Sequence, residues 1–145
     1  MNQQLRQDAD RIIADAIHAV LPDQAVIRAL EAASFPGRIR LIAAGKAAWQ
    51  MAQAASKTLG DSLECGVICT KYGHCGGKLP KITCCEGGHP IPDENSLRAT
   101  DAALSLVQGL TAQDTVLFLL SGGGSALFEK PLIPLHELQD ITQQL

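Results

Sequence analysis

Residues 115–125, TVLFLLSGGGS, decide the fold that we expect for this chain. Thr115–Leu120 reads as a strand without polar alternation, and such a strand is typically covered on both faces, as in a parallel sheet layered by helices. Ser121–Ser125 then turns the chain through three consecutive glycines, which adopt backbone angles that other residues avoid. The stretch therefore predicts a buried parallel strand that ends in a polar, glycine-rich turn.

The same order of strand, turn and helix recurs along the chain. Three further strands are expected, at Arg38–Ala44, Gly66–Thr70 and Lys81–Cys85. Helical patterns are expected at residues 5–20, 23–33 (capped by Asp23), 46–59 (closed by Gly60), 94–109 (capped by Asp93) and 135–145. Strands that alternate with helices predict an α/β fold with a doubly wound, mostly parallel sheet and helices on both faces.

Four glycine-bearing turns follow the expected strands. They are Gly45-Lys46, the loop that begins at Lys71, the Gly88-His89 loop and Ser121–Ser125. In a doubly wound sheet, ligands bind at the carboxyl ends of the strands. The sequence therefore predicts that these turns gather at one edge of the sheet and form a binding site there.

The turn Ser121–Ser125 has two readings. The backbone N–H groups of Gly122, Gly123 and Gly124 can form a concave nest that binds phosphate or carboxylate, with the flanking hydroxyls adding hydrogen bonds. The same glycines can equally serve a tight turn that needs positive φ angles. The nucleophile elbow G-x-S-x-G and the dinucleotide fingerprint G-x-G-x-x-G are both excluded. Each would need glycine at position 127, where this chain has Leu127.

Lys46 and His89 are the side chains with candidate chemistry at this edge. Lys46 follows Gly45 where a helix is expected to begin, so its ammonium can lie on an anion's oxygens; otherwise it is a solvated lysine. No Walker P-loop is present, because Arg40 and Ala47 occupy two of its required positions. His89 lies between Gly88 and Pro90, and it can hydrogen-bond a substrate or transfer a proton.

Composition excludes several classes of function. The chain has 145 residues, 46% hydrophobic and 19% charged, with a formal net charge of −3, which is typical of a globular domain and unlike a nucleic-acid binder. Its longest apolar run is too short for a membrane span, and its polar start is unlike a signal peptide, so we expect a cytoplasmic protein. The five cysteines lack zinc-type spacing, so core or loop thiols are favoured over a metal at Cys75, His74 and His89.

Taken together, four blocks of this sequence resemble the glycerate 2-kinase family, also called MOFRL-type glycerate kinases, some members of which carry the older label hydroxypyruvate reductase. The blocks are AGKAAWQMA at 44–52, KYG at 71–73, GHPIPDE at 88–94 and LSGGGSAL at 120–127. They occur in the family's order with similar spacing. The resemblance covers nearly all of the chain after about Gly37.

The resemblance implies an activity and roles for the residues at the sheet edge. Members of the family use ATP and a divalent metal such as Mg²⁺ to phosphorylate the 2-hydroxyl of D-glycerate, giving 2-phosphoglycerate. Lys46 matches the family's active-site lysine and is the implied catalytic residue. Residues that match blocks implied to bind substrate or nucleotide are Gly45, His89, Ser121, Gly122, Gly123, Gly124 and Ser125. No metal ligand is predicted in this sequence.

Family members are much longer than this chain. By resemblance, residues 1–145 are a Rossmann-like N-terminal lobe, interrupted within the helix expected at 135–145, and the second α/β lobe is absent. We expect little kinase activity from such a lobe alone, and self-association through the apolar surface that the second lobe would cover. Two alternatives remain open: a hydroxypyruvate reductase, disfavoured because no strand ends in G-x-G-x-x-G, and a non-catalytic lobe that binds an anion.

Overall fold

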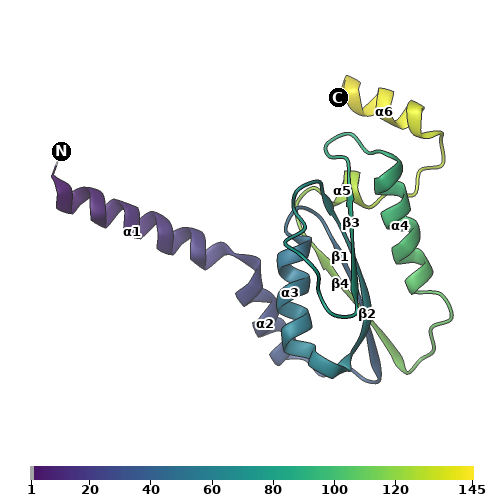
Figure 1. Ribbon diagram of the computed structural model, residues 1–145, viewed down its shortest axis with the longest axis horizontal. Helices are drawn as coiled ribbons and strands as arrows, with labels where there is room; N and C mark the ends of the chain where they lie inside the picture. Colours follow the sequence, from purple (N-terminus) through teal and green to yellow (C-terminus); the bar gives the residue numbers. More distant parts are fainter. Residues whose placement is uncertain (1) are drawn as a thin grey trace.

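A computed structural model describes residues 2–145, and a parallel sheet of four strands forms its centre (Figure 1). The strands are β1 (Arg38–Ala44), β2 (Leu63–Lys71), β3 (Ile82–Gly87) and β4 (Asp114–Leu120), in the order β3-β2-β1-β4. Every neighbouring pair runs parallel. The predicted α/β fold with a mostly parallel sheet is therefore confirmed. Met1 lies outside the described residues, and the assignment of the chain as one lobe of a larger enzyme remains a prediction.

Helices cover both faces of the sheet, as predicted. The elements are α1 (Gln3–Val20), α2 (Pro22–Glu31), α3 (Ala48–Leu59), a 3₁₀ turn η1 (Gly60–Ser62), α4 (Glu94–Leu106), α5 (Gly124–Leu127) and α6 (Leu135–Gln144). Helices α2 and α3 lie against one face, and α4 lies against the other (Figure 1). The alternation of strands and helices thus produces the doubly wound arrangement.

Several helix starts and ends differ from those expected, three of them for a clear local reason. Asp23 does not cap α2, because Pro22 already occupies its first turn and Leu21 is the N-cap residue. Helix α3 begins at Ala48 rather than at Lys46, since the preceding residues form a turn. Helix α4 ends at Leu106, and Gly109, with φ of 67°, turns the chain toward β4.

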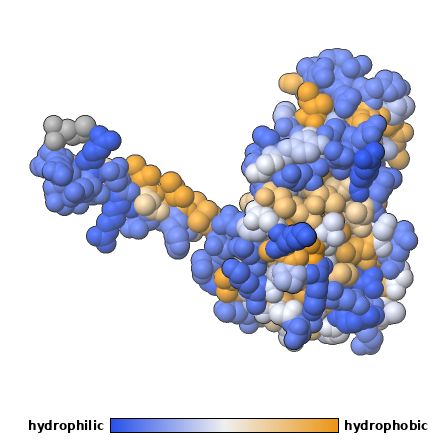
Figure 2. All heavy atoms as spheres, viewed as in Figure 1, coloured by the Kyte–Doolittle hydropathy of each residue, from blue (hydrophilic) through white to orange (hydrophobic). Residues whose placement is uncertain are grey.

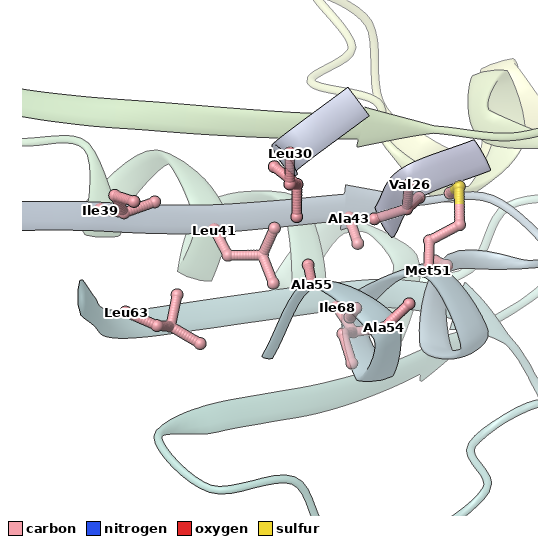
Figure 3. Close-up of a cluster of buried hydrophobic side chains, with 12 residues drawn as sticks. Val26, Leu30, Ile39, Leu41, Ala43, Met51, Ala54, Ala55, Leu63 and Ile68 are labelled. Carbon is pink, nitrogen blue, oxygen red and sulfur yellow. The ribbon is translucent and has the colours of Figure 1, made fainter. Parts of the chain in front are cut away.

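The main core lies between the sheet and helices α2 and α3. Leu41 of β1 and Ile68 of β2 are fully buried there, and Met51 of α3 packs with them (Figure 3). Several alanines of α3 face the strands, and their small side chains let the helix approach the sheet closely. A second cluster, on the other face, joins Ile42 and Val67 to the alanines of α4.

The prediction that Thr115–Leu120 is covered on both faces is wrong. Strand β4 lies at the edge of the sheet, and α4 packs over β2 and β3 instead of over β4. Leu117 and Leu119 pack against the main core, whereas Val116, Phe118 and Leu120 are 38%, 43% and 64% exposed. One face of the apolar strand β4 is therefore left partly uncovered by the rest of residues 2–145.

Helix α1 confirms the predicted amphipathic pattern but does not pack against the sheet. It projects away from the rest of the molecule, and all of its residues lie at the surface (Figure 1). Its apolar residues form a visible stripe (Figure 2), which includes Ile12, 68% exposed, and Val20, 80% exposed. Within residues 2–145, no helix is long and apolar enough to cross a membrane.

Candidate functional site at the carboxyl edge of the sheet

The turn after β1 is joined to the turn after β4 by hydrogen bonds. The N–H of Lys46 donates to the carbonyl of Gly122 over 2.9 Å, and the N–H of Ala47 donates to the hydroxyl of Ser121 over 3.0 Å. Gly45 has φ of 111°, and a Cβ at this position would lie 2.3 Å from the Ser121 Oγ. Both the backbone angle and the close approach therefore require glycine at position 45.

The turn after β4 brings Lys46 and His89 together. Gly123 adopts a left-handed conformation with φ of 86°. A Cβ on Gly123 would lie 2.7 Å from Nε2 of His89 and 3.3 Å from Cε of Lys46. Both side chains therefore pack against the backbone of this one glycine. Three of the four predicted turns, Gly45-Lys46, Gly88-His89 and Ser121–Ser125, therefore meet here. The roles assigned to their residues remain predictions.

The geometry of the glycine turn suits an anion. Within the part of the chain that the structure describes, the backbone N–H groups of Gly122, Gly123 and Gly124 donate no hydrogen bond to another residue. Amide donors without internal partners, next to a lysine ammonium and an imidazole, can satisfy the oxygens of a phosphate or carboxylate. Ser125 follows at the start of the short helix α5.

The hydroxyl of Ser121 has a structural role that the sequence did not indicate. It accepts the hydrogen bond from Ala47 and donates to the carbonyl of Ala44 over 3.3 Å. A hydroxyl has one proton to donate, so Ser121 is committed to linking β1, α3 and β4 in this conformation. That Ser121 binds the ligand remains a prediction.

The loop between β2 and β3 forms one side of the site. Nδ1 of His74 lies 2.9 Å from the carbonyl oxygen of Lys46, and the indole N–H of Trp49 donates to the carbonyl of Gly77 over 2.9 Å. These contacts hold the fourth predicted motif, which begins at Lys71, against the start of α3. His74 was not among the predicted site residues, because its contact joins positions 28 residues apart in the chain.

Asp93 anchors the loop that carries His89. It caps α4 in a capping box with Ser96, which confirms the predicted N-cap, and it accepts a 2.7 Å hydrogen bond from the hydroxyl of Tyr72. Burial raises the pKa of the Asp93 carboxyl, but hydrogen bonds from Tyr72, Ser96 and the Gly88 backbone outweigh it and hold this pKa below its usual value. Asp93 is therefore an ionised structural anchor at neutral pH.

The residues of the site do not line the main surface hollows of residues 2–145. Four surface hollows, of about 300 to 510 Å³, are lined by other residues. Helix α6 borders the edge, since Nε2 of Gln139 donates to the carbonyl of Pro92 over 2.9 Å. Within residues 2–145, no group of three or more His, Cys, Asp or Glu side chains is arranged to hold a metal ion.

These features define a class of protein: a doubly wound α/β domain with a lysine, a histidine and glycine-turn amides at the carboxyl edge of its sheet. Residues 8–145 match the family described as "Domain of unknown function (DUF4147)", and the chain belongs to that family.

Relatives with assigned names share this sequence over nearly its whole length. The chain is 47% identical over 145 residues to the D-glycerate 2-kinase of Thermotoga maritima, covering 99% of this chain and 34% of the relative. It is 40% identical to the glycerate 2-kinase of Pyrococcus horikoshii, covering 97% of this chain and 34% of that relative.

The fold agrees with a solved structure. The crystal structure of glycerate kinase from Thermotoga maritima superimposes with a TM-score of 0.90 at 46% identity, over 98% of this chain and 34% of that one. The chain thus spans about a third of the length of the relatives that it matches.

Proposed function

We propose that this chain is the Rossmann-like N-terminal lobe of a glycerate 2-kinase, which transfers the γ-phosphoryl group of ATP to the 2-hydroxyl of D-glycerate and releases 2-phosphoglycerate. The likeness to named glycerate 2-kinases supports the reaction. The observation that carries the proposal within this chain is the packing of Lys46 and His89 on Gly123, beside the glycine-turn amides. A second lobe would complete the cleft.

The proposed chemistry follows from the charges at the edge. Phosphoryl transfer is accelerated mainly by positioning and by neutralising negative charge, with little covalent chemistry from the protein. The Lys46 ammonium neutralises either the carboxylate of glycerate or the transferred phosphoryl group. The amides of Gly122, Gly123 and Gly124 hold the oxygens of the same or the neighbouring anion. His89 donates a hydrogen bond to substrate or moves a proton; both roles are compatible with its place at the edge.

The Mg²⁺ that the resemblance implies does not fit the residues of this edge. Mg²⁺ prefers oxygen ligands, above all carboxylates, whereas Lys46, His89 and the glycine amides are nitrogen groups. Of the carboxylates at this end of the sheet, Asp93 is already bound to Tyr72 and Ser96, and Glu86 accepts a hydrogen bond from the N–H of Cys75. We therefore derive no step through a metal in this lobe.

The uncovered face of β4 supports a docked second lobe. Val116, Phe118 and Leu120 expose apolar surface beside the glycine turn, and burying such surface is favourable. In its absence we expect copies of the chain to associate through this face. The proposed partners are otherwise small molecules, ATP and glycerate, and a cytoplasmic location, where ATP is available, belongs to the same proposal.

A substitution of Lys46 tests this proposal. In a two-lobe protein that contains this chain, Lys46→Ala should lower kcat/KM for glycerate by about 10²- to 10³-fold, the range found when one transition-state donor is removed. ADP formation gives the readout. Lys57→Ala, which replaces an exposed lysine in the last turn of α3, is the matched control and should change little. An unchanged kcat/KM in the Lys46 variant would remove the proposed role.

Two assays separate the alternatives. Consumption of NADH with hydroxypyruvate, without ADP formation from glycerate, would favour the reductase instead. The isolated 145-residue chain should bind anions but show little turnover, because half a cleft excludes water poorly. Robust kinase turnover by this chain alone would contradict the need for a second lobe.

A further inference from the structure

All five cysteines lie on β2, β3 and the loop between them, and their side chains are divided between the two faces of the sheet. All five are free thiols. Cys69 and Cys85 are register partners on β2 and β3, and both belong to the cluster beneath α4. Cys84, the neighbour of Cys85, points to the opposite face and packs against the main core.

The loop from β2 to β3 places Cys75 on the same face as Cys84. The N–H of Cys75 donates to Oε1 of Glu86 over 2.9 Å. Glu86 lies two residues after Cys84 on β3, so both side chains point to one face. Cys75 and Cys84 also line the same hollow, of about 460 Å³. The two thiols are thus neighbours beside a space that a small molecule can enter.

We propose that Cys75 and Cys84 form a redox-active thiol pair, which low-molecular-weight disulfides oxidise reversibly to an intramolecular disulfide. The pair is a modification site independent of the proposed kinase reaction. The disulfide would link the loop between β2 and β3 to β3, the strand that follows this loop.

The oxidation proceeds by two exchanges. The Cys75 thiolate attacks one sulfur of the small disulfide RSSR, which forms a Cys75–S–S–R bond and releases RS⁻. The Cys84 thiolate then attacks the Cys75 sulfur, which forms the Cys75–Cys84 bond and expels the second RS⁻. The two cysteine protons pass through solvent to the released thiolates. Two cysteine thiols are thus oxidised while RSSR is reduced to two RSH.

The surroundings of the thiols favour this order of attack. Burial, followed by the adjacent Cys75 thiol, raises the pKa of the Cys84 thiol, so Cys84 is the poorer first nucleophile. Cys69, in contrast, is fully buried, and burial raises its pKa to about 12, which protects that pair from oxidation.

The disulfide would have a consequence at the carboxyl edge. The same loop carries His74, whose Nδ1 contacts the carbonyl of Lys46. A bond from Cys75 to β3 restricts this loop. We therefore expect slower amide hydrogen exchange in residues 72–78 of the oxidised chain than in the reduced chain.

The test measures thiols in the whole 145-residue chain, equilibrated with oxidised and reduced glutathione at increasing ratios. After acid quenching the chain is unfolded, its remaining free thiols are alkylated, and the alkylated thiols are counted by intact mass. The expected result is a loss of two alkylatable thiols, with a Cys75–Cys84 link in the peptide map, reversed by excess reduced glutathione. Cys75→Ser should abolish the loss, Cys84→Ser should stop at a Cys75–glutathione mixed disulfide with the loss of one thiol, and the control Cys65→Ser should keep the loss of two.

Other outcomes would overturn the proposal. They are retention of all five thiols in the folded chain at every ratio, a Cys69–Cys85 link, or links only between separate chains. Loss of two alkylatable thiols in the Cys75→Ser variant would also overturn the proposal. If a variant fails to fold, as judged by circular dichroism, the peptide map of the unaltered chain still decides. None of these results depends on kinase activity, so the thiol pair and the proposed function can fail separately.

Discussion

Strands β1 and β4 look alike in sequence but lie in different surroundings. Both are mainly apolar, both span seven residues, and they pair residue by residue, with Ile42 opposite Phe118. Ile42 is 4% exposed in the centre of the sheet, whereas Phe118 is 43% exposed at its edge. The position of a strand in the sheet therefore determines what covers it more than the composition of the strand does.

At their carboxyl ends the two strands share one environment. The turn after β1 requires glycine at position 45 because Ser121 packs against it, and the turn after β4 requires glycine at 123 because His89 and Lys46 pack there. The candidate site thus lies where the central strand meets the edge strand. The proposed second lobe would cover the edge strand without rebuilding these turns.

Truncating one side chain in each strand tests the comparison of β1 with β4, and this test has the largest expected effect. Leu41→Ala in β1 should lower the free energy of unfolding by about 3 kcal/mol, since the side chain is fully buried. Phe118→Ala in β4 should cost only about 1 kcal/mol, mostly through its edge-to-face contact with Phe128. Urea unfolding measures both values. Equal losses would mean that β4 is as well covered as β1, for example by self-association, which sedimentation would reveal.

Glycine substitutions probe the shared end of the strands. Gly45→Ala should cost about 2 kcal/mol, because it combines an unfavourable φ with a clash against Ser121. Gly109→Ala is the matched control: its φ is also positive, at 67°, but no atom lies within 4 Å of the added Cβ, so about 1 kcal/mol is expected. Thermal unfolding compares the two. A smaller loss at position 45 than at 109 would contradict the close packing of the turns.

Asp93 offers the smallest expected effect, and one that depends on pH. Asp93→Ala should lower stability by about 1 kcal/mol through loss of the helix cap. Because the folded pKa lies below the unfolded value, the contribution of the carboxylate is present above the unfolded pKa of about 3.9 and is lost as the pH falls through the folded pKa. Asp93→Asn keeps a cap but should lose this pH dependence. If the parent chain and Asp93→Asn have identical acid unfolding profiles, the pH dependence does not come from the Asp93 carboxylate.

The sequence predicted much of this fold because strands, helices and glycine turns are local features. The strands β1 to β4 lie within a few residues of their expected positions, and the rule for parallel sheets correctly brought Gly45, Lys46, His89 and Gly123 to one edge. The order of the strands is not local, so the exposure of Phe118 was missed. Likewise, the periodicity of α1 predicted an amphipathic helix but carried no information on what its apolar face contacts.

Two details of the site were missed for the same reason. The Ser121 hydroxyl bonds Ala47, 74 residues away in the chain, and His74 contacts Lys46 across 28 residues. Neither pair is related by helical or strand spacing. Such contacts arise only once the sheet has formed, and no local pattern of residue types predicts them.

Binding of inorganic phosphate to the isolated chain tests the central claim, that Lys46 and the glycine-turn amides hold one anion. Phosphate titration followed by backbone amide chemical shifts should give saturable changes at Gly122, Gly123 and Gly124. Lys46→Ala should weaken this binding about tenfold or more, the effect of losing one charge-assisted hydrogen bond. Unchanged glycine amide shifts in the folded chain, or an affinity that Lys46→Ala leaves the same, would contradict the account.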